Sequence, residues 1–567
     1  MGSTVGAALV VTAAPAAAST ITVTNTSDSG SNSLRYVLEN LSEPSTVVLS
    51  AGATYELTDC TKNGGDILIN DVVTIQGNGA TIEQTCNDAR VLETHSNITL
   101  ENVTITGGNL QNSIGGGLVT IDASTTLTGV TFTGNSSGCA AGAVWATGQL
   151  TVTSSTFTDN HVSSGECDEE GGAIAFDPTF RLDAASAKTN VSSSASATIT
   201  DSTFTNNSTA DDGGAVAAPS GDSMLITGST FNGNSSHDEG GAVSTEAEGF
   251  NLTIVNSTIT NNSTCDTGAI FADGATLSLV YDTITDNTGM DCVRSAAADD
   301  PHAASPQAPD GIPTAVTVEF GTFKPFGTVI VGTAPYCDVT NNVTVASQGY
   351  NYSNEGTGET CGFEASTDNH VATNDAKLGS LADNGGPTAT QLPQTRSPLI
   401  DGIPADECGG GDDAAGFSVT TDQRGVSRPQ LHGCDIGSVE VKGSSLSVAK
   451  VVTGLGGQAV PFAGPYTFAV KCSDGTTGSL SVADPNGGAS AAVANIEPGS
   501  TCTVVEGTVT IDGISLAPTY SPVAADTTGV VLDPDVPEGT ANVVTVTNDY
   551  TQILAAHAVR QQPRFTG

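Results

Sequence analysis

A short phrase that returns at nearly constant spacing between residues 82 and 287 is the feature that most constrains the fold. Each copy is a β-rich stretch ending in Phe or Ile, followed after two residues by Asn. The copies are Phe132/Asn135, Phe157/Asn160, Phe204/Asn207, Phe231/Asn234, Ile259/Asn262 and Ile284/Asn287. Neighbouring copies are 25, 27, 28 and 25 residues apart, except for one step of 47 residues that contains a Ser- and Ala-rich insert at 177–197. A fixed period in this range is typical of stacked structural units.

A second phrase, a small-residue step before an apolar residue, alternates with the first. It begins at Gly116, Gly142, Gly171, Gly213, Gly240 and Gly268. Short Thr, Val and Ile runs separate the two phrases, and no helical period is present. The pattern therefore predicts an all-β fold, a right-handed parallel β-helix with one coil per repeat. We expect Phe and Ile to stack inside, the Asn residues to form an amide ladder, and Gly to occupy tight corners.

The charge of the chain excludes one class of partner. The 567 residues contain 16 Lys and Arg against 61 Asp and Glu, a formal net charge of −45. A phosphate backbone would be repelled, so we expect no nucleic-acid partner. The excess of acids suits an extracellular or high-salt setting and would attract divalent cations.

The twelve cysteines are spaced in consecutive pairs. We predict the disulfides Cys60–Cys86, Cys139–Cys167, Cys265–Cys292, Cys337–Cys361, Cys408–Cys434 and Cys472–Cys502. The first five separations nearly equal the repeat period, so we expect these pairs to join adjacent coils. Residues 1–18 resemble a signal peptide with a truncated start, and no segment is long and apolar enough to span the membrane. These features predict an oxidising location, either secreted or cell-wall associated.

The ends of the repeat region predict the domain boundaries. Ser33 is a helix N-cap before an amphipathic stretch at 34–38, which we expect to cover the open first coil. The β-helix should occupy 19–442, with an irregular C-terminal cap at about 375–441 and a surface loop at 294–313. Short alternating runs at 443–550 predict a small β-sandwich, and 551–567 reads as a flexible tail.

Several phrases in the β-helix resemble known families. The Gly-Gly-Ala-Ile and Phe-x-x-Asn phrases resemble those of chlamydial polymorphic outer-membrane proteins. The opening Ser33-Leu34-Arg35 and the closing phrases at 381–388, 397–401, 422–425 and 434–437 resemble bacterial secreted "choice-of-anchor" proteins. This resemblance covers roughly residues 20–441. It implies a pectate-lyase-like β-helix that bacteria secrete or display, and it implies no particular reaction.

The C-terminal region resembles Ig-like domains of actinobacterial surface proteins and, more distantly, the collagen-adhesin B-type fold. In the latter, a first-strand Lys condenses with a last-strand Asn, assisted by a middle-strand acid. Lys450, Asn548 and Glu506 occupy the matching places, so the resemblance implies an isopeptide bond. The alternative is a solvated Lys, an acid at a strand end and a turn Asn, in a domain stapled by Cys472–Cys502.

Acidic residues gather before the Gly-Gly corners. They include Glu169, Glu170, Asp211, Asp212, Asp238, Glu239 and Asp266, with His237 beside them. Neighbouring coils would place such carboxylates about 5 Å apart, a spacing that suits Ca²⁺ or a glycoside hydrolase. If the protein is an enzyme, the candidate catalytic residues are Asp211, Asp212, His237, Asp238 and Glu239. A solvated acidic turn is the simpler interpretation. A lyase is less favoured, because between residues 91 and 289 the basic residues are Arg181 and Lys188, both in the insert.

The leading hypothesis is a monomeric, adhesin-like protein without catalytic activity, which presents a β-helix face and loops to a glycan or a cell surface. We expect no cofactor beyond bound Ca²⁺. A polysaccharide-cleaving enzyme and a structural spacer are the alternatives, because a β-helix fold alone does not define a function.

Overall fold

The computed structural model describes residues 19–163, 170–179, 195–290, 315–332, 336–339, 342–354, 360–370, 376–409, 418–454, 465–483, 490–511, 514–522, 525, 529–532 and 542–551. The predicted leader, the loop at 294–313, most of the insert at 177–197 and the tail after residue 551 lie outside this part of the chain. Within it, strands make up nearly every element, and the helices are α1 (Leu34–Glu39) and η1 (Asn63–Gly65). The all-β prediction is confirmed.

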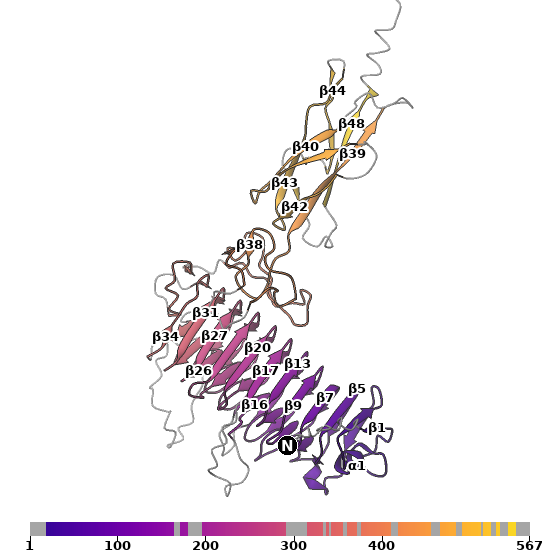
Figure 1. Cartoon of the computed structure of the whole chain (residues 1–567), viewed down its shortest axis with the longest axis vertical. Helices are drawn as coiled ribbons and strands as arrows, with labels where there is room; N and C mark the ends of the chain where they lie inside the picture. The colour runs from indigo at the N-terminus through magenta and orange to yellow at the C-terminus, as the bar shows by residue number, and fades with distance from the viewer. Residues whose placement is uncertain are drawn as a thin grey trace, which may run out of the picture.

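Successive coils stack as parallel strands on three faces, which Figure 1 shows as a row of arrows running from β1 to β34. Face 1 is β1 (Ser19–Val23), β2 (Ser45–Leu49), β5 (Val73–Gln84), β7 (Ile98–Thr106), β9 (Thr125–Thr128), β13 (Leu150–Thr153), β17 (Ser196–Thr200), β20 (Ser223–Thr227), β23 (Asn251–Val255), β27 (Thr276–Val280), β31 (Thr322–Phe326) and β34 (Thr344–Val345). Face 2 is β3 (Thr54–Leu57), the second halves of β5 and β7, β10 (Thr131–Thr133), β14 (Thr156–Thr158), β18 (Thr203–Thr205), β21 (Thr230–Asn232), β24 (Thr258–Thr260), β28 (Thr283–Thr285), β32 (Val329–Val331), β35 (Tyr352–Ser353) and β36 (Asn369–His370).

Face 3 is a ten-stranded parallel sheet. Its strands are β4 (Ile67–Ile69), β6 (Leu92–Thr94), β8 (Leu118–Thr120), β12 (Val144–Ala146), β16 (Ile174–Phe176), β19 (Val216–Ala217), β22 (Val243–Thr245), β26 (Ile270–Asp273), β30 (Val316–Glu319) and β33 (Cys337–Asp338). Between faces 2 and 3 lie short corner strands, β11 (Ser136–Ser137), β15 (His161–Val162), β25 (Ser263–Thr264) and β29 (Thr288–Gly289).

The repeated Phe and Asn residues form the interior that the sequence predicts. The Phe132, Phe157, Phe204 and Phe231 rings stack with centroid distances of 5.3, 4.8 and 4.7 Å. The Asn residues of the repeated phrase form a ladder in which the side-chain Nδ2 of each Asn donates to the Oδ1 of the next. The ladder runs from Asn135 through Asn160, Asn207, Asn234 and Asn262 to Asn287, with distances of 2.9–3.1 Å. Because these amides are buried and paired, the ladder fixes the register of neighbouring coils.

The Gly-Gly steps lie at tight corners, and their two positions have different requirements. In the steps that begin at Gly171, Gly213 and Gly240, the first Gly has a positive φ of 66°, 69° and 59°, a conformation that Gly adopts without strain. The second packs against the next coil, because a Cβ on Gly214 would lie 2.1 Å from the Gly241 carbonyl oxygen. Both positions therefore favour Gly, as the repeat predicts.

The N-terminal cap is also confirmed. The Ser33 hydroxyl accepts a hydrogen bond from the Tyr36 backbone N–H at 3.2 Å and begins α1, which packs against β1 and β4. Arg35 is buried, and its Nε lies 2.7 Å from Asp28 Oδ1. This ion pair and the helix cover the first coils.

The C-terminal cap, residues 376–441, is irregular as predicted, with one short antiparallel pair, β37 (Ile403–Pro404) and β38 (Gly433–Cys434). It does more than close the last coil. It also turns back along face 2, where Thr258 Oγ1 donates to Gln423 Oε1 at 2.7 Å. Thr230, Thr258 and Thr283 are consequently buried beneath it.

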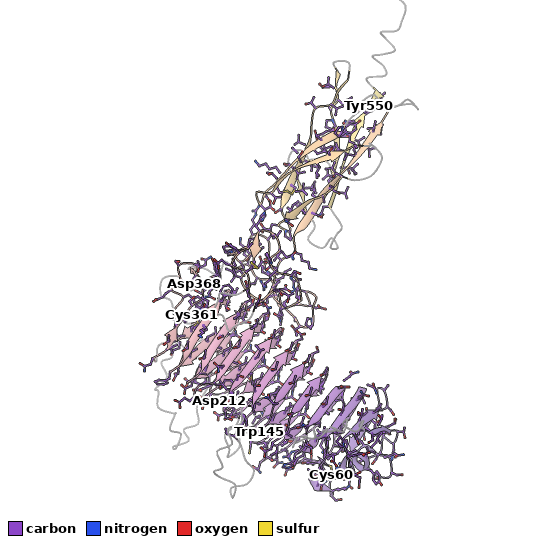
Figure 2. The ribbon with its side chains drawn as sticks, in the orientation of Figure 1. Cys60, Trp145, Asp212, Cys361, Asp368 and Tyr550 are labelled. Carbon is purple, nitrogen blue, oxygen red and sulfur yellow. A yellow bond between two sulfur atoms is a disulfide. The ribbon has the colours of Figure 1, made fainter. Side chains whose placement is uncertain are left out.

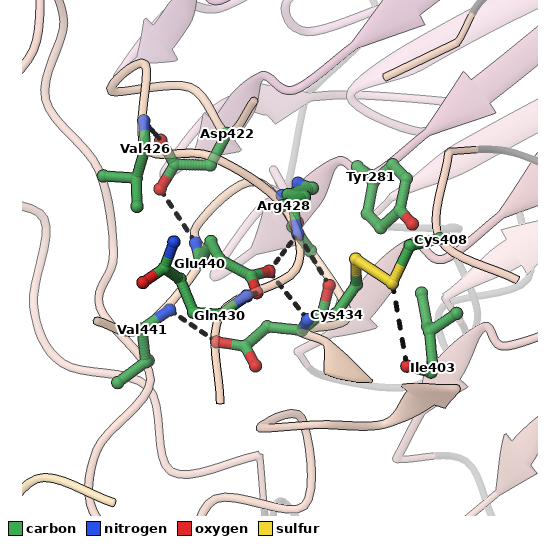
Figure 3. A network of polar contacts seen from close by, with 12 residues as sticks. Tyr281, Ile403, Cys408, Asp422, Val426, Arg428, Gln430, Cys434, Glu440 and Val441 are labelled. Atoms are coloured by element: carbon green, nitrogen blue, oxygen red, sulfur yellow. Dashed lines mark hydrogen bonds and ion pairs between the residues drawn. A yellow bond between two sulfur atoms is a disulfide. The ribbon is translucent and has the colours of Figure 1, made fainter. Parts of the chain in front are cut away.

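A buried ionic network ties the cap to the coils (Figure 3). Arg428 donates to Glu440 Oε2 at 2.8 Å, and both side chains are 0% exposed. The Arg428 guanidinium lies 4.1 Å from the centre of the Tyr281 ring, which belongs to a coil. Asp435 accepts from the Val441 backbone N–H at 2.6 Å. Arg428, Glu440 and Asp435 each form hydrogen bonds within the cap, and within this network, among the described residues, only Nε of the Arg428 guanidinium lacks a partner, so we assign the network a structural role.

Four of the six predicted disulfides are confirmed, namely Cys60–Cys86, Cys337–Cys361, Cys408–Cys434 and Cys472–Cys502. Cys139 and Cys265 are also disulfide-bonded, and their predicted partners Cys167 and Cys292 lie outside the described residues. The placement of one pair between adjacent coils was wrong. Cys408–Cys434 lies inside the cap, beside the β37–β38 pair, because the coils have already ended there. Disulfides indicate an oxidising, extracellular environment.

The C-terminal region forms two facing four-stranded sheets, which extend beyond the cap in Figure 1. One contains β42 (Val493–Ile496), β39 (Ser444–Thr453), β48 (Asn542–Asp549) and β46 (Thr519–Ser521). The other contains β41 (Thr477–Val482), β40 (Tyr466–Cys472), β43 (Thr501–Glu506) and β47 (Val530–Val531), and a separate hairpin joins β44 (Thr510–Ile511) to β45 (Ile514–Ser515). Apolar residues from both sheets share one core. β39 and β48, the first and last strands, pair in parallel.

Candidate functional site

The core of the sandwich contains three polar side chains that the sequence analysis placed together. β39 alternates inward Val448, Lys450 and Val452, so the strand period directs Lys450 into an apolar interior. Asn548 is on the adjacent strand β48, opposite Val452, and therefore faces the same side as Lys450. Glu506 is the last residue of β43 in the other sheet. The sandwich thus brings all three predicted residues to one point.

Lys450 and Asn548 both lie within hydrogen-bonding distance of Glu506. Lys450 Nζ lies 2.9 Å from Glu506 Oε1, with the two side chains 0% and 2% exposed. Asn548 Nδ2 donates to the same oxygen at 3.3 Å. Asn548 Oδ1 is buried and accepts no hydrogen bond from the described residues. A buried carbonyl without a hydrogen-bond partner is costly, so the hydrogen bonds of this amide do not by themselves explain its burial.

The surroundings of Lys450 act on the pKa of its amine in two opposite directions. Burial lowers the pKa of Lys450, and the Glu506 carboxylate opposes that shift. The Tyr466 ring lies 4.9 Å from Nζ, and its hydroxyl pairs with Tyr550 at 2.9 Å, so aromatic rings exclude water from this side. Figure 2 places Tyr550 near the end of the sandwich away from the cap. An amine that loses its proton to Glu506 is a nucleophile beside an amide carbon.

A second candidate site lies on the β-helix, where acids meet over face 3 (Asp212 in Figure 2). Carboxylate oxygens of Asp211, Asp212 and Asp238 lie within 4.8 Å of one another, and so do those of Asp212, Glu239 and Glu246. The Glu239 backbone N–H donates to Asp212 Oδ1 at 2.9 Å, which fixes the two corners relative to each other. Carboxylates at this spacing suit a hard divalent cation.

The pKa values of two acids in this cluster, Asp212 and Glu239, are raised. Burial, then the neighbouring Glu246 and Asp238, raises the pKa of Glu239 from 4.5 to about 9. Burial, followed by Asp211 and Glu239, raises the pKa of Asp212 well above its usual range. Like charges held this close disfavour one another's ionisation, so a shared proton or a cation would stabilise the cluster.

The predicted acids are only partly brought together. Asp211, Asp212, Asp238 and Glu239 meet as expected, whereas Glu170 and Asp266 join neither carboxylate group among the described residues. Glu170 lines a shallow cavity together with Asp212 and Glu246. Glu169 lies outside the described residues. His237 is exposed and lies 3.2 Å from the Thr209 carbonyl oxygen, on the coil before it.

Sequence reasoning missed two contributors to the cluster. Glu246 directly follows β22, at the far end of a three-residue strand from the Gly-Gly corner, and Glu319 ends β30 and contributes to the raised pKa of Glu239. The repeat pattern singles out acids before the Gly-Gly step, whereas these two acids lie at the other end of a strand. Because face 3 strands are so short, acids after the strand reach the same cluster, and this strand length was the available signal.

Comparisons with known proteins support the two-part architecture. Residues 143–299 match the family described as Right handed beta helix region, and residues 446–551 match Domain of unknown function (DUF5979). The first match agrees with the predicted handedness of the coils. No curated protein and no solved structure matches the chain. In the described part of the chain, none of the helices has the length and apolar character that membrane crossing requires.

Proposed function

We propose that this protein is an extracellular binding protein without catalytic activity, secreted or associated with the cell wall. The β-helix presents its faces to a glycan or a cell surface. The sandwich acts as a stalk that is locked by an isopeptide bond between Lys450 and Asn548. The observation that carries the proposal is the buried contact of Lys450 and Asn548 with the same Glu506 oxygen. The resemblance to "choice-of-anchor" and actinobacterial surface proteins supports the same location.

The bond-forming reaction needs only these three side chains. Nζ of uncharged Lys450 attacks Cγ of Asn548, and the Nζ–Cγ bond forms as the Cγ–Nδ2 bond breaks. Glu506 carries the proton from Nζ to the leaving Nδ2, which departs as ammonia. Burial supplies both the uncharged amine and the close approach, so proximity replaces an external catalyst.

The intact mass of the reduced, purified chain tests the lock. We expect the wild-type protein to be lighter than its sequence by one ammonia, and a peptide map should show residues 450 and 548 in one cross-linked fragment. Glu506→Gln should retain the full mass, because the proton carrier is lost. Lys471→Arg, a change at an exposed lysine of β40, should leave the cross-link intact. A wild-type chain that keeps the ammonia contradicts the proposal.

Polysaccharide cleavage is the second candidate function. It is favoured by the clustered Asp212 and Glu239, since a carboxyl that holds its proton beside an ionised one can act as general acid. Incubation of the protein with a panel of plant and microbial polysaccharides separates the candidates. Retention of the protein without products supports the binding role, and release of oligosaccharides supports the enzyme. The absence of both retention and products supports a structural spacer.

A further inference from the structure

Face 2 carries two outward rows of side chains that stay in register from coil to coil. The first row is Thr without interruption at Thr54, Thr81, Thr104, Thr131, Thr156, Thr203, Thr230, Thr258 and Thr283. The second row, two residues further along each strand, begins with Glu56 and Glu83 on the first coils and continues as Thr106, Thr133, Thr158, Thr205, Asn232, Thr260 and Thr285. Equivalent hydroxyls therefore repeat once per coil, about every 4.8 Å.

The C-terminal cap already occupies one end of these rows. Gln423 accepts from Thr258 Oγ1 at 2.7 Å and donates to Thr230 Oγ1 at 3.0 Å. Thr230 also donates to the Ala389 carbonyl oxygen at 2.6 Å, and Thr283 Oγ1 contacts the Ser438 hydroxyl at 3.1 Å. The groups that the cap presents to the rows are uncharged amides, hydroxyls and carbonyls. This interface shows which chemistry the rows accept.

The same rows continue beyond the cap on β7, β10, β14 and β18. The outward Thr residues of these strands are partly exposed: Thr104, Thr106, Thr131, Thr133, Thr156, Thr158, Thr203 and Thr205. Thr has a restricted χ1 on a strand, and the parallel Phe rings stack beneath these strands, so the hydroxyls are largely held in place before binding. The outward positions here carry no charge.

We propose that these uncovered rows bind a β-1,4-linked chain of N-acetylglucosamine, lying along the axis of the β-helix. Its acetamido and hydroxyl groups are those that Gln423, Ser438 and the cap backbone present to the neighbouring part of the same rows. Successive sugars of such a chain are turned over relative to each other, and two sugars are close in length to two coils, so every second sugar meets an equivalent Thr pair. The net charge of −45 disfavours an anionic polymer. The inference deepens the proposed binding function and rests on it.

Sedimentation of the full-length protein with chitin, at high salt to suppress charge effects, tests the assignment. We expect the wild-type chain to bind chitin and to release on addition of soluble N-acetylglucosamine oligomers. Thr131→Val, Thr156→Val and Thr203→Val together remove three hydroxyls and keep the β-branched shape. This variant should bind at least about tenfold more weakly, as expected for three lost hydrogen bonds that act together.

The matched control is the triple change Thr126→Val, Thr151→Val and Thr198→Val on face 1, which should bind like the wild type. Equal urea midpoints for both variants would confirm that both fold. Unchanged chitin binding by the face 2 variant overturns the assignment. Binding to another polysaccharide without binding to chitin also overturns it, while the proposed binding function stands. A chain that binds no polysaccharide or cell surface overturns both.

Discussion

Removing one amide from the Asn ladder should destabilise the β-helix by an amount that the structure allows us to estimate. Asn207 Oδ1 accepts from the Asn160 backbone N–H at 3.1 Å and from Asn160 Nδ2 at 2.9 Å, and its own Nδ2 donates to Asn234 Oδ1 at 3.0 Å. Asn207→Ala leaves the buried Asn160 N–H without its acceptor and opens a small cavity. We expect a loss of about 2–4 kcal/mol in the free energy of unfolding.

The fluorescence of Trp145, the only Trp of the chain, provides the assay. It is buried on β12, in an apolar cluster that includes Ile114, Val119 and Ala175, and should report urea unfolding of these coils. The control is Asn232→Ala, the same chemical change at a partly exposed position of face 2, which should cost less than about 1 kcal/mol. If the two variants unfold at the same urea concentration, the ladder is not what holds neighbouring coils in register.

Two further predictions concern buried charge. Because the pKa of Glu239 is raised from 4.5 to about 9, the folded state holds more protons; this contribution is full below about pH 4.5 and is lost as the pH rises toward 9. The melting temperature should therefore decline as the pH rises, and Glu239→Gln should reduce this decline, whereas the exposed Glu56→Gln should not. Ca²⁺ at pH 8 should raise the melting temperature of the wild type more than that of Glu239→Gln. Arg428→Met leaves Glu440 buried without its cation, so we expect a loss of about 3–5 kcal/mol and faster proteolysis within residues 376–441, unlike the exposed Arg396→Met. A flat pH profile or an unchanged cap would contradict these arguments.

The regular part of the β-helix was predictable because each repeated residue type is needed for one structural reason that recurs in every coil. An Asn such as Asn207 recurs where a corner amide must be paired, and a Gly such as Gly213 recurs where φ is positive. For these residues the requirement repeats with the coil period, which the sequence displays directly. Lys450 was identified differently, from the resemblance to the collagen-adhesin B-type fold, and the structure shows that its side chain is buried.

The course of the cap was not predictable in this way. Gln423 meets Thr258 across 165 residues, and nothing periodic connects them. Thr is equally suitable on a solvent-exposed strand surface and on one that another segment covers. The Thr rows of face 2 therefore have the same sequence pattern where the cap buries them and where they are exposed. Glu246 was missed for a related reason, because an acid after a strand has no special pattern until the length of that strand is known.

The parallel pairing of β39 and β48 determines how the sandwich responds to a stretching force. The chain enters the sandwich at Ser444, the start of β39, and leaves it at Asp549, the end of β48, so tension between the two ends slides one strand lengthwise past the other. All the hydrogen bonds of this pair would have to break together rather than one after another. A protein anchored at one end and bound to a surface at the other would therefore resist detachment at its stalk even while the coils and cap were deformed.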